Sequence, residues 1–288
     1  QGENSGQDIS QEQLDQAVEI IRQRVDGAGV SEAEITTQSG RNIVVSMPGV
    51  PSSETRELIQ TSAQMAFRPV IVSGAGAATP ENQRTDPKSI PQPEGEPENS
   101  SDPKWVTRDL FARYEALDCS APRPQEERAS QPQDKAIVAC DPLSNAKFIL
   151  GPVEIPGTDI ATASYAQATN SQGHATGGFA VNLQFNDEGT QTFKELSERL
   201  YGLGQGGQNG ARNRFAIVLD GSVVSAPTMN AVITDGRAQI TGNFTEDEAK
   251  FLSEQLKYGA LPVSFSIDSE QQISATPVSY THLRAHET

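Results

Sequence analysis

The stretch RFAIVLDGSVVSA (214–226) sets the local fold of the second half of the chain. An Asp-Gly pair between two apolar runs is the strongest short-range signal for a β-hairpin, so Asp220-Gly221 predicts a tight turn between antiparallel strands. Asp235-Gly236 repeats this signal between AVIT (231–234) and RAQIT (237–241), where we expect a second hairpin. The second half of the chain is therefore predicted to contain antiparallel strands, and the neighbouring segments are interpreted relative to them.

Helices alternate with these strands. A polar stretch at 161–178 is expected to separate the earlier strands from the strand FAVNLQF (179–185). A helix follows that strand, with Asn186 or Asp187 as its cap. The last helix begins at a capping box, T-E-D-E at 245–248. Strands and helices in this order predict an α+β fold.

The N-terminal region predicts a smaller unit of the same class. Strands are expected at 34–38, 41–47 and 65–72, and a second helix at 53–62. The order helix–strand–strand–helix–strand lacks only a leading strand to make a split βαβ sandwich of ferredoxin-like type. The first helix carries one apolar stripe, formed by Leu14, Ala17, Val18, Ile21 and Val25.

The composition changes between these two regions. Residues 73–135 hold nine of the 18 prolines, and Ile90 is the only large apolar residue within 74–102. A segment with so little apolar surface cannot offset the entropy of ordering, so we expect a flexible Pro-rich insert. A short helix is expected within it near 104–118, with Asp102 as the cap.

Three aromatic residues of this short helix are candidates for contact with another polypeptide: Trp105, Phe111 and Tyr114. Aromatic side chains contribute much of the energy at protein interfaces, and a mobile insert would present them to a partner. The alternative is that the helix docks on its own module and buries them.

The chain has two cysteines, Cys119 and Cys140. A metal site usually needs three or four ligands, and no histidine lies near this pair. A disulfide closing a loop of about 20 residues would stabilise the fold by ~3 kcal/mol in the chain-entropy model. We therefore expect a disulfide and an oxidising compartment, with two free thiols as the alternative.

Composition and motifs exclude several classes of function. The formal net charge of −16 argues against nucleic acid as a partner. No stretch approaches the roughly 20 apolar residues that cross a bilayer, so we expect the chain to be soluble as it stands. The G-x-G-x-x-G at 202–207 follows a helix instead of opening one, which is the wrong order for a nucleotide site, and His174 has no neighbouring nucleophile. We expect no enzyme, no catalytic residues, no metal and no cofactor.

Several long strings resemble the large extracytoplasmic domain of the SecD family. In the first half these are VEIIRQRVDGAGVSEAEI (18–35), RNIVVSMPGV (41–50) and AQMAFRPV (63–70). In the second half, in the same order as in the family, they are FAVNLQFNDEGTQTF (179–193), RFAIVLDGSVVSAPTM (214–229), GRAQITGNFTEDEA (236–249) and GALPVSF (259–265). The final residues SYTHLRAHET (279–288) look vector-derived and are set aside.

The resemblance implies a ferredoxin-like base subdomain at 9–72, closed by a strand at 261–267, and a head subdomain at 136–260. Hinges are expected near 70–74 and 258–262. The family is an accessory membrane subunit of the Sec protein translocase, in which this domain stands on the extracytoplasmic face of the bacterial cell membrane. The resemblance implies that it binds emerging unfolded secretory polypeptides as head and base move, driven by proton flow. SecF and the SecYEG channel are the implied partners. The alternative is a static extracytoplasmic adhesion or wall-binding module.

Overall fold

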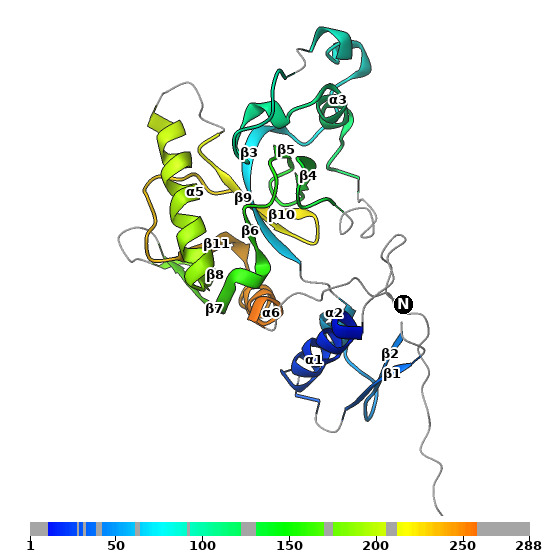
Figure 1. The fold of residues 1–288 in the computed structure, drawn as a ribbon. Coiled ribbons are helices and arrows are strands. Elements are labelled where there is room, and N and C mark those ends of the chain that lie inside the picture. Colours follow the sequence, from blue (N-terminus) through cyan, green and yellow to red (C-terminus); the bar gives the residue numbers. More distant parts are fainter. Residues whose placement is uncertain are drawn as a thin grey trace, which may run out of the picture.

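The structure, a computed structural model, describes residues 11–27, 29–30, 33–38, 42–60, 64–90, 93–121, 131–169, 175–205 and 212–257 of the chain. These residues form an α+β fold in which a small N-terminal unit lies beside a larger one (Figure 1). The N-terminal unit contains α1 (Gln11–Gly27), β1 (Glu34–Gln38), β2 (Asn42–Ser46) and α2 (Ser53–Gln60).

The N-terminal unit has its own core. The apolar stripe of α1 is buried except for the half-buried Val18, with Ala17 and Val25 fully enclosed, and Ile35 of β1 packs against it. β1 and β2 pair antiparallel from Glu34↔Ser46 to Gln38↔Asn42. The predicted helices and the first two strands of this region are confirmed.

The third strand expected in this unit pairs with strands of the larger one. β3 (Met65–Ala75) pairs on one edge with β9 and on the other with β5 and β6. Assignment of the strand 65–72 to the base subdomain stays a prediction. Residues 70–74, where a hinge was expected, lie inside β3. Residues 67–71 are all buried, as in a strand covered on both faces at the centre of a sheet. The closing strand expected at 261–267 and the hinge at 258–262 lie outside the described residues.

The larger unit contains two sheets. The first has the order β10-β9-β3-β5-β4, with β6 also paired to β3. The second has the order β11-β8-β7. Their remaining strands are β4 (Ile137–Asp141), β5 (Ala146–Leu150), β6 (Ile155–Pro156), β7 (Ile160–Thr169), β8 (Ala175–Phe185), β9 (Phe215–Leu219), β10 (Ser222–Ser225) and β11 (Arg237–Phe244).

One aromatic cluster joins the two sheets to the helices α5 (Asp187–Gln205) and α6 (Glu246–Lys257). The ring of Phe67 on β3 lies 4.9 Å from that of Phe185 on β8, and Phe193 of α5 lies 5.5 Å from Phe215 of β9. Leu252 of α6 is part of the same core. Fully buried aromatic side chains of this kind contribute much of the stability of a domain.

Local signals place the helix ends and one of the two hairpins as predicted. Asn186 caps α5, its Oδ1 accepting from the amide of Gly189 at 2.8 Å. Thr245 and Glu248 form the predicted capping box, because each side chain bonds the amide of the other. The hairpin at Asp220-Gly221 forms with positive φ at both turn residues (46° and 74°), as a type I′ turn requires.

Two expectations about strands are wrong. The segment 231–234 is not a strand, because its Ile233 amide donates to Ser197 Oγ on α5 at 2.9 Å, and β11 pairs with β8 instead. The polar stretch 161–178 is not merely a separator, because most of it lies in β7 and the start of β8. Small residues such as alanine, serine and threonine gave no period-2 pattern of large apolar side chains there.

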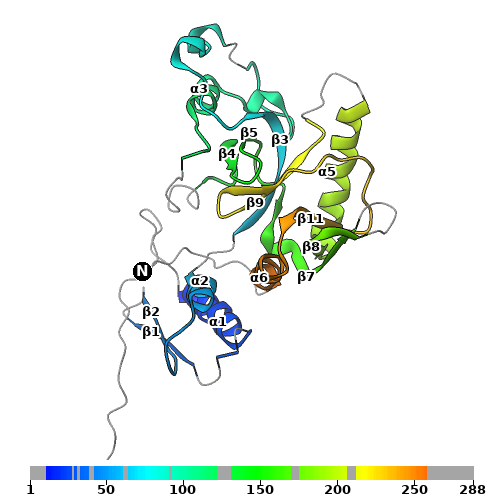
Figure 2. The same ribbon diagram turned by 180° about the vertical axis from the view of Figure 1, so that it is seen from behind.

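Short helices complete the fold: η1 (Glu81–Gln83), η2 (Pro87–Ser89), η3 (Pro103–Trp105), α3 (Arg108–Ala116) and η4 (Gly157–Asp159). In both views α3 lies at the end of the molecule remote from α1 and α2 (Figures 1 and 2). Within the described ranges, every helix is too short or too polar to cross a bilayer.

Candidate functional site: the docked insert and its disulfide

The short helix of the insert begins later than its sequence suggests. Asp102 caps the 3-10 turn η3, where its side chain accepts from the amide of Lys104. Thr107 caps α3 itself, its Oγ1 accepting from the amide of Leu110. The single helix expected near 104–118 is thus two short pieces, because both Asp102 and Thr107 offer a cap and the chain uses both.

The insert is docked on the larger unit. Leu110 and Tyr114 of α3 form a core cluster with Val138 of β4 and Ile149 of β5. Phe111 is half-buried beside this cluster. The expectation of a flexible insert is therefore wrong for residues 73–90 and 93–121, and the alternative in which the helix docks on its own module is the one observed. Residues 122–130 lie outside the described part.

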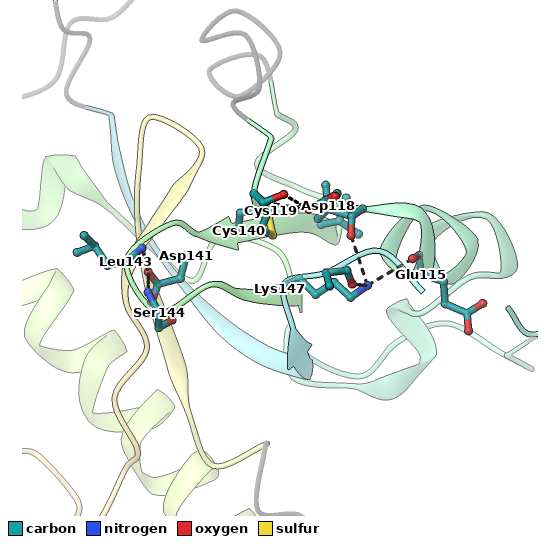
Figure 3. Close-up of a disulfide and its surroundings, with 12 residues drawn as sticks. Glu115, Asp118, Cys119, Cys140, Asp141, Leu143, Ser144 and Lys147 are labelled. Carbon is teal, nitrogen blue, oxygen red and sulfur yellow. Dashed lines mark hydrogen bonds between the residues drawn. A yellow bond between two sulfur atoms is a disulfide. The ribbon is translucent and has the colours of Figure 1, made fainter. Parts of the chain in front are cut away.

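A disulfide joins the end of the insert to the sheet. Cys119 and Cys140 are bonded, with their Cα atoms 5.5 Å apart (Figure 3). Cys140 lies on β4, opposite Lys147 of β5 in the antiparallel register. Cys119 follows α3, and its amide donates to the carbonyl of Gly76 just beyond β3. The disulfide therefore fixes the chain that leaves α3 against the strands on which α3 packs.

Lys147 holds the same segment from the sheet side. Its side chain is buried, and Nζ donates to the carbonyls of Ala77, Glu115 and Leu117 at 2.9, 3.3 and 3.4 Å. Two of these carbonyls belong to the C-terminal end of α3, where a cation complements the helix dipole. Burial lowers the pKa of Lys147, while the charges of Glu115 and Asp118 oppose that shift.

Glu115 ties α3 to the Pro-rich part of the insert. Its buried carboxylate accepts from the Thr85 amide at 3.0 Å and from Thr85 Oγ1 at 3.0 Å. The carbonyl of the same residue also accepts from the amide of Thr79 at 2.8 Å. A buried carboxylate needs such donors, because an unsatisfied one costs several kcal/mol. Few apolar residues are needed to order this segment once its polar groups are satisfied in this way.

A second tie connects the insert to α5. Arg199 donates to Glu154 Oε2 at 2.8 Å and to the hydroxyls of Ser100 and Ser101 at 3.1 Å each. Arg212 donates to the carbonyl of Ser101 at 2.9 Å. Arg199, Arg212 and Ser101 border an open cleft of about 280 Å³ that carries both acidic and basic groups. The cleft therefore has no single charge preference.

The three aromatic candidates are placed differently from one another. Tyr114 is only 7 % exposed, and burial raises the pKa of its hydroxyl. Trp105 is half-buried and donates from Nε1 to the carbonyl of Asn99 at 2.9 Å. The ring of Phe111 lies 5.9 Å from that of Tyr114. Contact of these residues with a client stays a prediction, and Tyr114 has little free surface for it.

Sequence reasoning missed the polar residues that hold this site together. Lys147 stands in the otherwise apolar strand AKFIL, and a lone lysine inside a buried strand is a signal that its ammonium has acceptors nearby. Glu115 and Arg199 sit on ordinary amphipathic helices, so their partners at Thr85 and Glu154 become visible only in three dimensions.

Two family models match the chain, one over the N-terminal unit and most of β3 and the other within the larger unit. The model described as "Protein translocase subunit SecDF, P1 domain, N-terminal" matches residues 14–71, and "SecDF, P1 head subdomain" matches residues 136–263. A SecD from Streptomyces coelicolor is 31% identical over 93% of this chain and 57% of its own length. A SecD from Acetobacter pasteurianus is 29% identical over 92% of this chain and 39% of its own length. The chain thus spans about half the length, or less, of these curated relatives.

Solved structures give the same answer for the fold. A structure described as "Structure and function of a membrane component SecDF that enhances protein export" superposes with a TM-score of 0.59 at 24% identity, covering 94% of this chain and 98% of that one. The crystal structure of SecDF in the "Super-membrane-facing form" gives a TM-score of 0.58 at 25% identity, covering 92% of this chain and 28% of that one.

The two matched units, in this order on one chain, define a P1-type domain with a head subdomain. The segment that contains α3 and the disulfide lies mostly between the two matched ranges. The chain belongs to the SecD family of protein translocase subunits.

Proposed function

We propose that the chain is the extracytoplasmic domain of a Sec translocase accessory subunit, and that it binds unfolded polypeptide emerging from the channel. The observation that carries the proposal is the presence of both P1 subdomains, in order, on one chain. One similar solved structure is that of a membrane component that enhances protein export, which supports an export role here. SecF and the SecYEG channel are the proposed partners of the whole protein, at the extracytoplasmic face of the cell membrane.

The proposed mechanism is movement of the head relative to the base. The N-terminal unit has a core separate from those of the larger unit, so the two can turn without breaking either core. The connection runs from the end of α2 at Gln60 to the start of β3 at Met65. In this proposal the rest of the protein couples proton flow to the movement, and this domain performs no covalent chemistry.

One buried charge marks the boundary between the units. Arg24 of α1 is fully buried, and burial lowers its pKa to about 10 while Asp220 of the β9–β10 turn opposes the shift. Asp220 also accepts from the amide of Gln64, the residue before β3, at 2.9 Å. Opposite charges that interact across the boundary would favour one relative orientation until another interaction competes with them.

Site-specific photo-crosslinking tests the proposal. Probes are placed over residues 104–118 and over the head, and the chain is offered a permanently unfolded secretory protein, with the folded form of the same protein as control. Crosslinks to the unfolded form alone support polypeptide binding. Equal labelling of both forms, or none, contradicts it and leaves a structural or partner-docking role.

A further inference from the structure

β7 is an edge strand with no outer neighbour among the strands that the structure describes. Its inner edge pairs with β8, and the register is unbroken from Thr162 to Gln167. Five of those six residues are exposed, and only Ala163 is half-buried. Alternate residues of an antiparallel strand point their N–H and C=O groups outward, so a run of six offers about three such residues over roughly 20 Å.

Between its two register shifts, which fall between Ile160 and Thr162 and between Gln167 and Thr169, β7 has few of the features that normally protect a sheet edge. α6 packs against β7 and β8. The sequence of β7, IATASYAQAT (160–169), contains no charged residue, no proline and no glycine. Proteins usually guard exposed edges with lysine, proline, bulges or short strands, because an open edge pairs with other extended chains. β11, on the opposite side of the same sheet, carries Arg237 and a register shift between Thr241 and Phe244.

The other sheet edges in the described residues are shorter or less open. β1 and β2, the two strands of the small sheet, have five residues each. β4 is buried at all five positions, and one of its carbonyls accepts from Gln131. β10 has four residues, and its register shifts between Val223 and Ser225. β7 is the longest of the described edge strands. An added strand would therefore find the longest regular row of backbone groups here.

A polar groove of about 440 Å³ adjoins this edge on the outer face of the sheet. Thr162 and Ser164 of β7 line it together with Asn182 and Gln239, whose side chains bond each other at 2.8 Å. That bond leaves the Nδ2 donors of Asn182 and the Oε1 acceptor of Gln239 for a ligand. Among the described residues that line the groove, Arg237 is the one charged residue and none is acidic. An uncharged extended segment therefore fits there without leaving a carboxylate unpaired.

We propose that β7 captures unfolded polypeptide by strand addition: an extended, uncharged segment of the client pairs with the outer edge of β7 over Thr162–Gln167, and a side chain of that segment reaches the end of the groove beside Thr162 and Ser164. The inference rests on the proposed function and names the surface that carries it. Main-chain hydrogen bonds supply the affinity, so binding depends little on client sequence, as a translocase that handles many clients requires.

Hydrogen exchange of the whole chain tests the proposal directly. Reduced, carboxymethylated lactalbumin is the unfolded probe and native lactalbumin is the control, at a salt concentration that screens repulsion between the two acidic proteins. In the free chain, the outward amides between Thr162 and Gln167 should exchange fast. With the unfolded probe they should slow by at least about tenfold, and with native lactalbumin they should not change.

A pair of substitutions at one position separates the backbone from the side chain. Successive amides alternate in direction, so the free-chain exchange identifies which of Ser164 and Tyr165 has the outward N–H. Proline at that residue removes the outward donor, which an edge position tolerates, whereas alanine keeps it. The proline variant should bind the unfolded probe about fivefold more weakly, the scale of one net hydrogen bond, and the alanine variant within about twofold of the parent. Unchanged circular dichroism and melting temperature show that the variants are folded.

The outcomes separate this inference from the proposed function. Binding of the unfolded probe without slowed exchange in β7, or with equal effects of proline and alanine, overturns strand addition and leaves polypeptide binding standing. Absence of any binding to the unfolded probe overturns both. Slowed exchange that depends on the concentration of the chain alone, with a dimer in sedimentation, overturns the proposal by showing that a second copy occupies the edge.

Discussion

Reduction of the Cys119–Cys140 disulfide should destabilise the larger unit by about 3 kcal/mol. The bond closes a loop with a sequence separation of 21 residues. In the chain-entropy model, a loop of that size restricts the unfolded chain by about 3 kcal/mol at 25 °C, which is roughly a hundredfold in the unfolding equilibrium. The folded insert should remain docked, because Lys147 and the α3 cluster hold the same segment independently of the sulfur atoms.

Urea denaturation with and without a reducing agent measures this effect. The parent chain should lose stability on reduction, whereas a variant with both cysteines replaced by alanine should unfold at the same urea concentration in both conditions. Native-state hydrogen exchange at α3 should stay slow after reduction. A loss below about 1 kcal/mol would show that the unfolded chain is already restrained in this region. Fast exchange across α3 would show that the disulfide, and not Lys147, docks the insert.

Three further perturbations follow from named contacts. A double-mutant cycle of Arg199→Ala and Glu154→Gln should give a coupling of about 1–2 kcal/mol in urea unfolding, because the pair is largely shielded from solvent and the hydrogen bond is charge-assisted; additive effects would contradict it. Asn186→Ala should cost about 1 kcal/mol by removing the cap of α5, with Asn186→Asp as the retained-cap control. The bonds from Thr245 lower the pKa of Glu248, so stability should fall as the pH drops below its usual value of 4.5, and Glu248→Gln should weaken that dependence in pH-resolved melting curves.

Local signals in the sequence were sufficient where the structure is local. The stripe on α1, the turn at Asp220-Gly221 and the capping box of α6 each depend on residues within a few positions of one another. The position of β3 was harder to predict, because a strand buried on both faces has no alternation to show which sheet it joins. Its neighbours β5 and β9 come from segments about 80 and 150 residues later, so pairing with them leaves no local trace.

The order of the insert was not predicted because its low apolar content shows only that it buries little apolar surface. A segment can also be ordered by hydrogen bonds from its polar groups to the rest of the fold. Residues 74–102 bury little apolar surface, yet their polar groups are satisfied by distant partners, such as Glu115 for Thr85 and Arg199 for Ser100. These contacts require the fold to exist first. The candidate site could therefore be proposed from its cysteines and aromatic residues. The lysine and the carboxylates that hold it in place could not be predicted from the sequence.

The insert and β7 differ in what they leave for a partner. The helix of the insert directs its apolar side chains into a core, and its C-terminal carbonyls accept from Lys147. β7 has one edge of its backbone paired to β8 and one edge without a strand in the described residues. An extended polypeptide gains hydrogen bonds by adding to such an edge, whereas it gains them at the insert only by displacing existing ones. Because strand addition forms new hydrogen bonds and binding at the insert first breaks existing ones, we expect the client to bind at the edge of β7 and not at the aromatic residues of α3.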